Sequence, residues 1–152
     1  MSDLRDLYQE VIIDHSRRPR NFGSLPGHNH HAEGFNALCG DKLTLYLKVV
    51  DGVIAEVRFE GAGCAISTAS ASLMSEALKG KNETQAEELF ARFHALLTEP
   101  DEKQAANHAE SLGKLQVLAG VREFPARIKC ATLAWHTLHA ALHDQAAPVS
   151  TE

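Results

Sequence analysis

Apolar and polar residues alternate along two adjacent segments near the middle of the chain. In KLTLYLKVV (residues 42–50) and again in VIAEVRFEG (residues 53–61), an apolar residue occupies every odd-numbered position up to 59. A period of two places one set of side chains on a single face of a β-strand. Gly52, in the Asp51-Gly52 pair between the segments, supplies the positive φ of a type I′ turn. The pattern therefore predicts an antiparallel hairpin that is buried on one face and pairs Val50 with Val53.

A hairpin alone makes only a marginally stable sheet, so a third strand is expected. The candidate is a weakly patterned segment at residues 31–35, which precedes the hairpin. Three antiparallel strands are therefore predicted.

Apolar residues in the rest of the chain recur at the spacing of amphipathic helices. Helices are predicted over residues 3–15, 65–79, 84–97, 111–120 and 125–144. The apolar face of the first helix consists of Leu4, Leu7, Tyr8, Val11 and Ile12.

The boundaries of the later helices follow from capping residues. Thr84 and Glu87 have the spacing of a capping box, and Pro125 suits the first turn of a helix. The polar residues 98–110 predict a loop with room for one short exposed helix.

Together these elements predict an α+β fold, in which helices pack on one face of a small antiparallel three-stranded sheet. Residues 1–145 are expected to form a single domain, and the polar residues 146–152 a disordered tail.

Charge and hydropathy limit the partners and the cellular location. The 152 residues carry a net charge of −5 without any run of Lys or Arg, so nucleic acid and anionic membranes are not expected partners. There is no apolar run of 18 residues, and the charged start MSDLRDLYQE does not resemble a signal peptide. We therefore expect a cytoplasmic protein whose three cysteines are reduced, which leaves metal binding, thiol chemistry or burial as their roles.

The predicted hairpin register brings two of these cysteines together. Residues whose numbers sum to 103 should pair, so Cys39 lies opposite Cys64 and Asp41 opposite Ala62. Cys130 falls in the first turns of the last helix, where the helix dipole is expected to lower the pKa of a thiol.

Three thiolates and the Asp41 carboxylate give the four ligands that a tetrahedral Zn²⁺ requires. The alternative is that Cys64 and Cys130 pack in the core, while Cys39 is an exposed loop thiol.

Histidines form two further groups in the sequence. His28, His30 and His31 lie in a polar loop with no cysteine near them, so we expect them to be solvated. A second group recurs at helical spacing late in the last helix and is also expected on a solvated face, where positive charge suits the C-terminal dipole. This group consists of His136, His139 and His143.

Several motifs resemble those of the U-type iron–sulfur assembly proteins, the family of IscU, SufU and the N-terminal domain of NifU. They are LYQEVIIDHSRRPRNFG at residues 7–23, CGD at 39–41, GAGCAISTASASLMSE at 61–76 and FPARIKCATLAWHTL at 124–138. The resemblance covers nearly the whole chain and implies the family's fold.

Details of these motifs look like the SufU branch. The 66 residues from Cys64 to Cys130 leave space for a helical segment that SufU has and IscU lacks. Lys129 stands where IscU-type scaffolds have a histidine, and their Leu-Pro-Pro-Val-Lys segment is missing. Ala37 departs from the proline that many relatives have before the CGD turn.

The SufU resemblance implies a zinc-dependent sulfurtransferase that serves a SufS-type cysteine desulfurase. Zinc would be held by Cys39, Asp41, Cys64 and Cys130. In this picture a histidine of the desulfurase replaces Cys39 on the metal, and Cys39 accepts persulfide sulfur for a downstream SUF scaffold or thiol acceptor. Arg127 would lie near the site and support Cys39, unless it is simply an exposed first-turn arginine.

Two other functions remain open at this point. The same ligands could hold a [2Fe-2S] or [4Fe-4S] cluster, which would make the protein a scaffold for cluster assembly and transfer. The other function is that of a docking domain whose zinc is purely structural. A cysteine hydrolase is less favoured, because the sequence places no histidine beside any cysteine.

Overall fold

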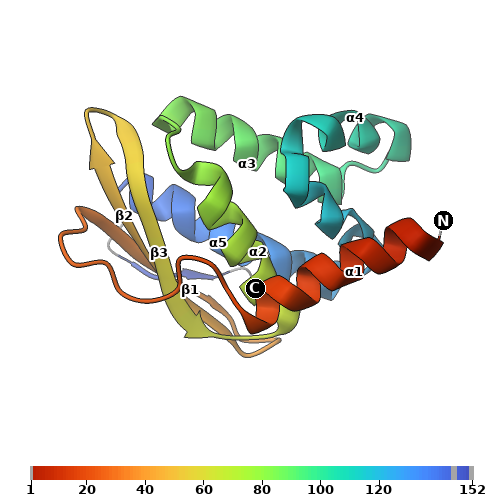
Figure 1. The fold of residues 1–152 in the computed structure, drawn as a ribbon, viewed down its shortest axis with the longest axis horizontal. Helices are drawn as coiled ribbons and strands as arrows, with labels where there is room; N and C mark the ends of the chain where they lie inside the picture. The colour runs from red at the N-terminus through yellow and green to blue at the C-terminus, as the bar shows by residue number, and fades with distance from the viewer. Residues whose placement is uncertain (1, 145–146, 151–152) are drawn as a thin grey trace.

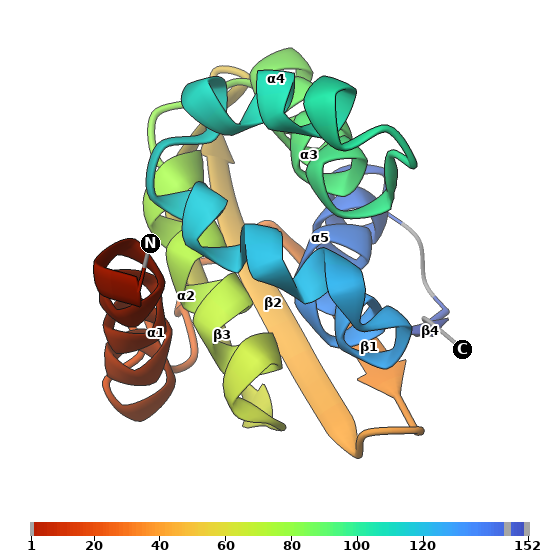
Figure 2. The ribbon, with the colours of Figure 1, turned by 90° about the vertical axis from the view of Figure 1, so that its right-hand side faces the viewer.

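The computed structural model describes residues 2–144 and 147–150, and among residues 1–7 it does not define the side chains. Six helical segments and four strands occur in the described part; Figure 1 labels α1 to α5 and β1 to β3, and Figure 2 also labels β4. They are α1 (Ser2–Arg17), β1 (His30–Asn36), β2 (Asp41–Val50), β3 (Val53–Ala62), α2 (Ala65–Leu78), α3 (Glu83–Thr98), α4 (Glu102–Leu112), the 3₁₀ segment η1 (Gly113–Glu123), α5 (Pro125–Leu142) and β4 (Val149–Ser150).

The strands form one sheet in the order β3-β2-β1-β4, and the helices cover one face of it (Figures 1 and 2). The predicted α+β class is therefore confirmed. The weak strand candidate is confirmed as β1, which runs antiparallel to β2 from His30 opposite Leu47 to Asn36 opposite Asp41.

The hairpin between β2 and β3 turns where the alternation predicts. Val50 pairs with Val53, and both Asp51 (φ 54°) and Gly52 (φ 78°) have the positive φ of a type I′ turn. The register then shifts by one residue, because Val49 faces Ile54 whereas Lys48 faces Glu56. Ala55 is the extra residue of this β-bulge.

The bulge corrects two expectations about β3. Ile54 is buried and Val53 is exposed, so the apolar face skips from Ile54 to Val57 instead of following the odd positions. Beyond the bulge, paired residue numbers sum to 104: Lys42 faces Ala62, where Asp41 was expected. The alternation predicted the strand but not the bulge, because Ile54 and Ala55 are both apolar and fit either face.

The C-terminal segment also differs from the expected disordered tail. Val149 and Ser150 pair in parallel with Gly34 and Phe35 and add the short strand β4, so the sheet has four strands and is mixed. Val149 packs partly buried against the core, which provides a reason for this segment to bind the edge of β1. Residues 146, 151 and 152 of the predicted tail lie outside the described residues.

The helices α2 and α5 lie directly on the sheet, and η1 packs on the side of them away from it (Figure 2). Trp135 of α5 is fully buried at the centre of the core, where its ring stacks on Phe93 at a centroid distance of 4.9 Å. Its indole N–H donates to the Ser70 hydroxyl, which in turn donates to the carbonyl of Ala131. Together these contacts of Trp135 and Ser70 connect α2, α3 and α5.

Helix boundaries agree with the predicted ranges to within a few residues, with three corrections. The segment predicted as one helix over 111–120 begins in α4 and continues as the 3₁₀ segment η1. The capping box of α3 is formed by Asn82 and Gln85 instead of Thr84 and Glu87. Residues 102–112, predicted mainly as a loop, form α4, because Asp101 caps its first turn and Ala105 and Leu112 are buried.

The first helix packs as its pattern predicts. Tyr8, Val11 and Ile12 lie partly buried against the core, whereas the side chains of Leu4 and Leu7 fall outside the described part. Among the described helices, none combines the length and the apolar character needed to cross a membrane.

Candidate metal centre

The segment NALCGD forms the connection between β1 and β2. Asn36 and Asp41 are the last paired residues of the two strands, so four residues make the loop between them. Leu38 at its tip is 66% exposed and Cys39 is partly exposed. Gly40 has φ 71°, a conformation that a residue with a Cβ adopts only under strain. The loop therefore presents Cys39 at the surface.

Asp41 is buried beneath this loop. One carboxylate oxygen accepts a hydrogen bond from the backbone N–H of Cys64 at 2.8 Å, and the other accepts one from the amide of Asn36 at 3.2 Å. Gly63 packs against it so closely that a Cβ at that position would lie 2.6 Å from the carboxylate. These contacts fix the orientation of Asp41 between β1 and the start of α2.

Cys64 is the N-cap residue of α2, where its sulfur accepts a hydrogen bond from the N–H of Ser67 at 3.4 Å. The sequence expectation of a cysteine at a helix N-terminus is confirmed for this residue. The hydrogen bond from its backbone N–H to Asp41 connects the segment after β3 to the first residue of β2.

Cys130 is fully buried and is the sixth residue of α5. Burial raises the pKa of its thiol, and hydrogen bonds with Cys39, Asp41 and Cys64 raise that pKa further. The predicted lowering of this pKa by the helix dipole is therefore wrong, since the dipole acts mainly within the first turn of a helix and Cys130 lies beyond it. A positive charge beside this buried thiol would favour its ionised form.

The structure thus brings together residues that are far apart in the sequence. The sulfurs of Cys39 and Cys130 and a carboxylate oxygen of Asp41 all lie within 4.8 Å of one another. Cys64 adjoins them through its contacts with Asp41 and Cys130. Two thiols and a carboxylate at this spacing, with the third thiol of Cys64 beside them but outside the 4.8 Å group, fit a metal ion or an iron–sulfur cluster.

Asn36 is a residue of this site that sequence reasoning missed. It is fully buried, and its amide donates to Asp41 and, at 3.5 Å, to the sulfur of Cys130. Its carbonyl oxygen has no hydrogen-bond partner. The signal was its position three residues before Cys39, at the last pair of a hairpin, where its side chain shares a face with that of Asp41.

The other predicted residues lie outside this group. Arg127 is exposed in the first turn of α5, one turn before Cys130. The ring of His28 packs beside those of His31 and Tyr46, and His30 contacts the carbonyl of Ala141 at the end of α5. These histidines stay apart from the cysteines, as the sequence indicated.

The late histidines of α5 are less uniformly solvated than expected. His136 is partly buried and packs edge-on against the ring of Phe90, with centroids 5.2 Å apart. His139 and His143 are partly exposed but both contact Glu87. They approach an acidic residue of α3 because this end of α5 lies against that helix.

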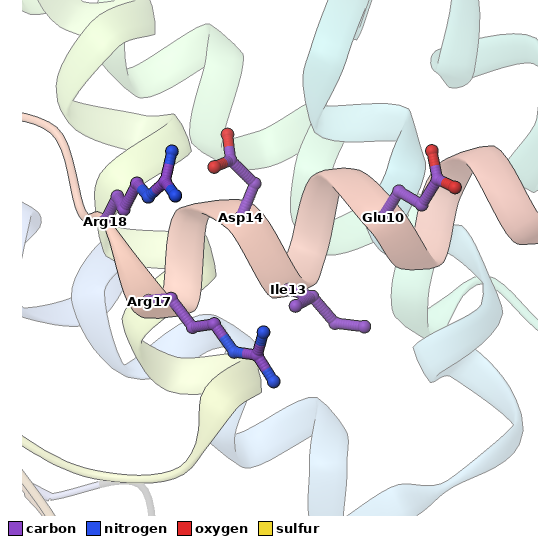
Figure 3. Close-up of a pocket in the computed structure, with 5 residues that line it drawn as sticks. All are labelled: Glu10, Ile13, Asp14, Arg17 and Arg18. Carbon is purple, nitrogen blue, oxygen red and sulfur yellow. The ribbon is translucent and has the colours of Figure 1, made fainter.

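A separate surface hollow of about 240 Å³ is lined by residues of α1 and by Arg18, which follows it, and Figure 3 shows them as sticks. Its lining consists of Glu10, Ile13, Asp14, Arg17 and Arg18. None of the cysteines contributes to it, so the candidate metal centre is not this hollow.

Comparisons with known proteins place the chain in one family. The model of the NifU-like N terminal domain matches residues 7–131. The chain is 40% identical to an iron–sulfur cluster assembly scaffold protein IscU of Streptococcus pyogenes serotype M1, over 96% of this chain and 89% of the relative.

Two further relatives carry SufU names. The zinc-dependent sulfurtransferase SufU of Bacillus subtilis (strain 168) is 40% identical over 90% of both chains. A crystal structure of a putative iron–sulfur cluster assembly scaffold protein for the SUF system from Fervidobacterium islandicum AW-1 superposes with a TM-score of 0.79 at 33% identity, covering 91% of this chain and 98% of that one. The chain therefore belongs to the NifU-like N-terminal domain family of iron–sulfur cluster assembly proteins, which includes IscU and SufU.

Proposed function

We propose that this protein is a zinc-dependent sulfurtransferase, which accepts sulfur from the persulfide of a SufS-type cysteine desulfurase. Cys39, Asp41, Cys64 and Cys130 would hold the zinc, and Cys39 would be the acceptor. The observation that carries this proposal is the unequal placement of the three thiols. Cys130 is enclosed in the core and Cys64 caps a helix, whereas Cys39 lies on an exposed loop beside Gly40.

Zinc, when bound, would keep these thiols deprotonated at neutral pH without redox chemistry of its own. The Cys39 thiolate then attacks the outer sulfur of the desulfurase persulfide. A sulfur–sulfur bond forms on Cys39, the sulfur–sulfur bond on the desulfurase breaks, and the desulfurase cysteine leaves as a thiolate with the electron pair. The exchange needs neither an oxidant nor a reductant.

Exposed apolar residues occur in the loop that carries Cys39 and at the start of the helix that carries Cys130. Leu38 precedes Cys39 in the loop, and Phe124, which is 59% exposed, is the N-cap residue of α5. Large apolar side chains in such positions suit contact with a protein partner. We propose that the desulfurase docks here and that Arg127, exposed in the same turn as Phe124, assists Cys39 by its charge.

The acceptor role is tested by the variant Cys39→Ala. Wild-type protein should raise the turnover of its desulfurase, and the variant should leave turnover at the level of the desulfurase alone. Mass spectrometry should locate a sulfur adduct on Cys39 of the wild type. A matched Asn29→Ala variant changes an exposed residue just before β1, at the other end of the β1–β2 pair from Cys39, and should stimulate fully.

The acceptor proposal fails if correctly folded Cys39→Ala protein stimulates as well as wild type. Circular dichroism provides the folding check. Because Cys39 is partly exposed, its truncation should leave the core intact.

A scaffold role is the second candidate, and it is favoured by the equal identity of the chain to a relative named as a scaffold. Thiolates bind iron–sulfur clusters as well as zinc. Anaerobic reconstitution followed by transfer to an apo-ferredoxin separates the two functions. A bound cluster that matures the target at a useful rate would support the scaffold, and a colourless zinc protein that only stimulates the desulfurase would support the sulfurtransferase.

A further inference from the structure

A second group of metal-binding side chains lies at the far end of α5 from Pro125. His139 lies in the last turn of α5 and His143 is the C-cap residue four positions later, so their side chains leave the same side of the helix end. This face lies beside α3, which contributes Glu87, and Figure 2 shows the two helices next to one another. The three side chains therefore meet across a helix–helix contact.

The donor atoms of the two histidines converge on one carboxylate. Nδ1 of His139 lies 3.1 and 3.2 Å from the two oxygens of Glu87, and Nε2 of His143 lies 3.2 Å from one of them. All three residues offer an atom within 4.8 Å of each of the others. Glu83, one turn earlier in α3, has an oxygen 3.8 Å from Nε2 of His143 and could act as a further ligand.

The surroundings suit an ion that enters from solvent. The side chains of His139 and His143 are each 44% exposed and that of Glu87 is 34% exposed. Two imidazoles and a carboxylate are a frequent ligand set of zinc and leave a coordination position for water. Mg²⁺ and Ca²⁺ prefer oxygen ligands and suit this group less well.

We propose that Glu87, His139 and His143 form a second metal site, which binds Zn²⁺ or a similar imidazole-preferring divalent ion independently of the cysteines. Bound metal would connect α3 to α5 and stabilise their contact, since a ligand that binds only the folded state raises its stability. The inference goes beyond the proposed function, because none of these residues belongs to the cysteine site.

The test uses the full-length protein whose cysteine site already holds one equivalent of zinc. Further Zn²⁺ is added at about pH 7.5, where most histidines are neutral. Equilibrium dialysis with metal analysis should find one additional zinc per chain. In NMR spectra the imidazole signals of His139 and His143 should shift, and the midpoint of thermal unfolding should rise.

Three variants identify the ligands. His139→Gln, His143→Gln and Glu87→Gln should each weaken binding of the additional zinc by at least about tenfold, since even losing a partner of a metal ligand costs about that much. The matched control is His108→Gln, which changes a partly exposed histidine of α4 and should bind like wild type. NMR spectra of the variants check that the fold is kept.

The proposal is overturned if zinc-loaded wild type takes up no further zinc, or if the folded variants keep wild-type affinity. Shifts confined to His28 and His31 would also overturn it, by assigning the additional zinc to the loop before β1. Loss of desulfurase stimulation has no bearing on this test, so failure of the proposed function is recognised separately.

Discussion

At the scale of single residues, Asn36 contacts two of the potential ligands of the candidate centre. Asn36 is the only residue in the described part of the chain with a buried side-chain oxygen or nitrogen that lacks a hydrogen-bond partner. Such an atom costs free energy on burial. The chain bears this cost while the amide of the same residue holds Asp41 and Cys130.

Replacing Asn36 should therefore weaken metal binding more than it weakens the fold. We expect Asn36→Ala to lower zinc affinity by about 10–100-fold, the range seen when hydrogen-bond partners of metal ligands are removed. Asn36→Asp keeps the size but adds a negative charge beside Asp41 and loses the donors. Competition against a zinc chelator measures both variants.

The matched control is Asn29→Ala, which removes an exposed asparagine that binds the backbone of Val49. Its zinc affinity should equal that of wild type. Affinity within about twofold of wild type for folded Asn36→Ala would show that the Asn36 contacts are incidental to the metal.

The sequence predicted much of this site for a definite reason. Cys39, Asp41 and Cys64 flank a hairpin whose pairing follows from alternation, so their proximity could be inferred from local rules. Cys130 was placed only by family resemblance, because no local pattern specifies how a distant helix docks. Asn36 was missed for a related cause: a polar residue at a strand end usually suggests a turn, and its burial depends on α5.

At the scale of elements, the contact between β1 and α5 determines where Cys130 lies. Gly34 allows this contact, because a Cβ there would lie 2.2 Å from the hydroxyl oxygen of Thr137 and 3.0 Å from a methyl carbon of Leu133. Both residues belong to α5 and are buried. Any side chain at position 34 would therefore displace α5 or force the side chains of Thr137 and Leu133 into unfavourable rotamers.

Gly34→Ala should therefore destabilise the protein by about 1–3 kcal/mol, the usual cost of overpacking a core. Denaturation by urea measures the loss. The reference variant is Gly120→Ala, where a Cβ meets nothing within 4 Å and no such cost is expected. Equal stabilities of the two variants would contradict the close approach.

Elements were predicted well where apolar residues follow one clear spacing, of a strand or of a helix, and poorly where they fit both spacings or neither. The alternation from Leu43 to Leu47 gave β2, and helical spacing with Pro125 gave α5. The bulge at Ala55 was missed. Helix α4 was predicted only as a loop with room for a short exposed helix, because its two buried residues provide too few apolar positions for a clear pattern. Strand β4 depends on its pairing with β1, and its two residues are too few to show a strand pattern in the sequence.

At the scale of the whole molecule, partly and fully buried histidines make stability depend on pH. His15 is buried, with Nδ1 2.7 Å from the Ser72 hydroxyl oxygen, and its pKa is lowered mainly by burial and then by the charge of Arg20. The pKa of His136 is lowered by burial and by His94 and His139. Both side chains are therefore favoured as neutral rings in the folded state.

The sign of the pH effect follows from these lowered values. Below about pH 6.5, the ordinary histidine pKa, the unfolded chain binds protons that folded His15 and His136 do not. Stability should be full above that pH and fall as pH decreases towards the folded-state values. Urea denaturation at about pH 7.5 and pH 5.5 should show this loss.

Single substitutions measure how much of the stability loss at low pH each histidine causes. His15→Asn keeps a polar atom near Ser72, and His136→Gln keeps a polar chain beside Phe90, yet neither side chain titrates. Each should reduce the difference in unfolding free energy between the two pH values. If both variants lose as much stability as wild type on acidification, other groups cause the effect.

The spacing of the cysteines along the chain also has a consequence for the order of assembly. Cys39 and Cys64 belong to hairpin ends that are close in sequence, but the third thiol arrives 66 residues later on a helix that packs over the finished sheet. A growing chain that has not yet produced α5 holds an incomplete ligand set. The four-ligand site proposed above could therefore be completed only after the last helix docks, and an ion bound by all four residues would report that folding is complete.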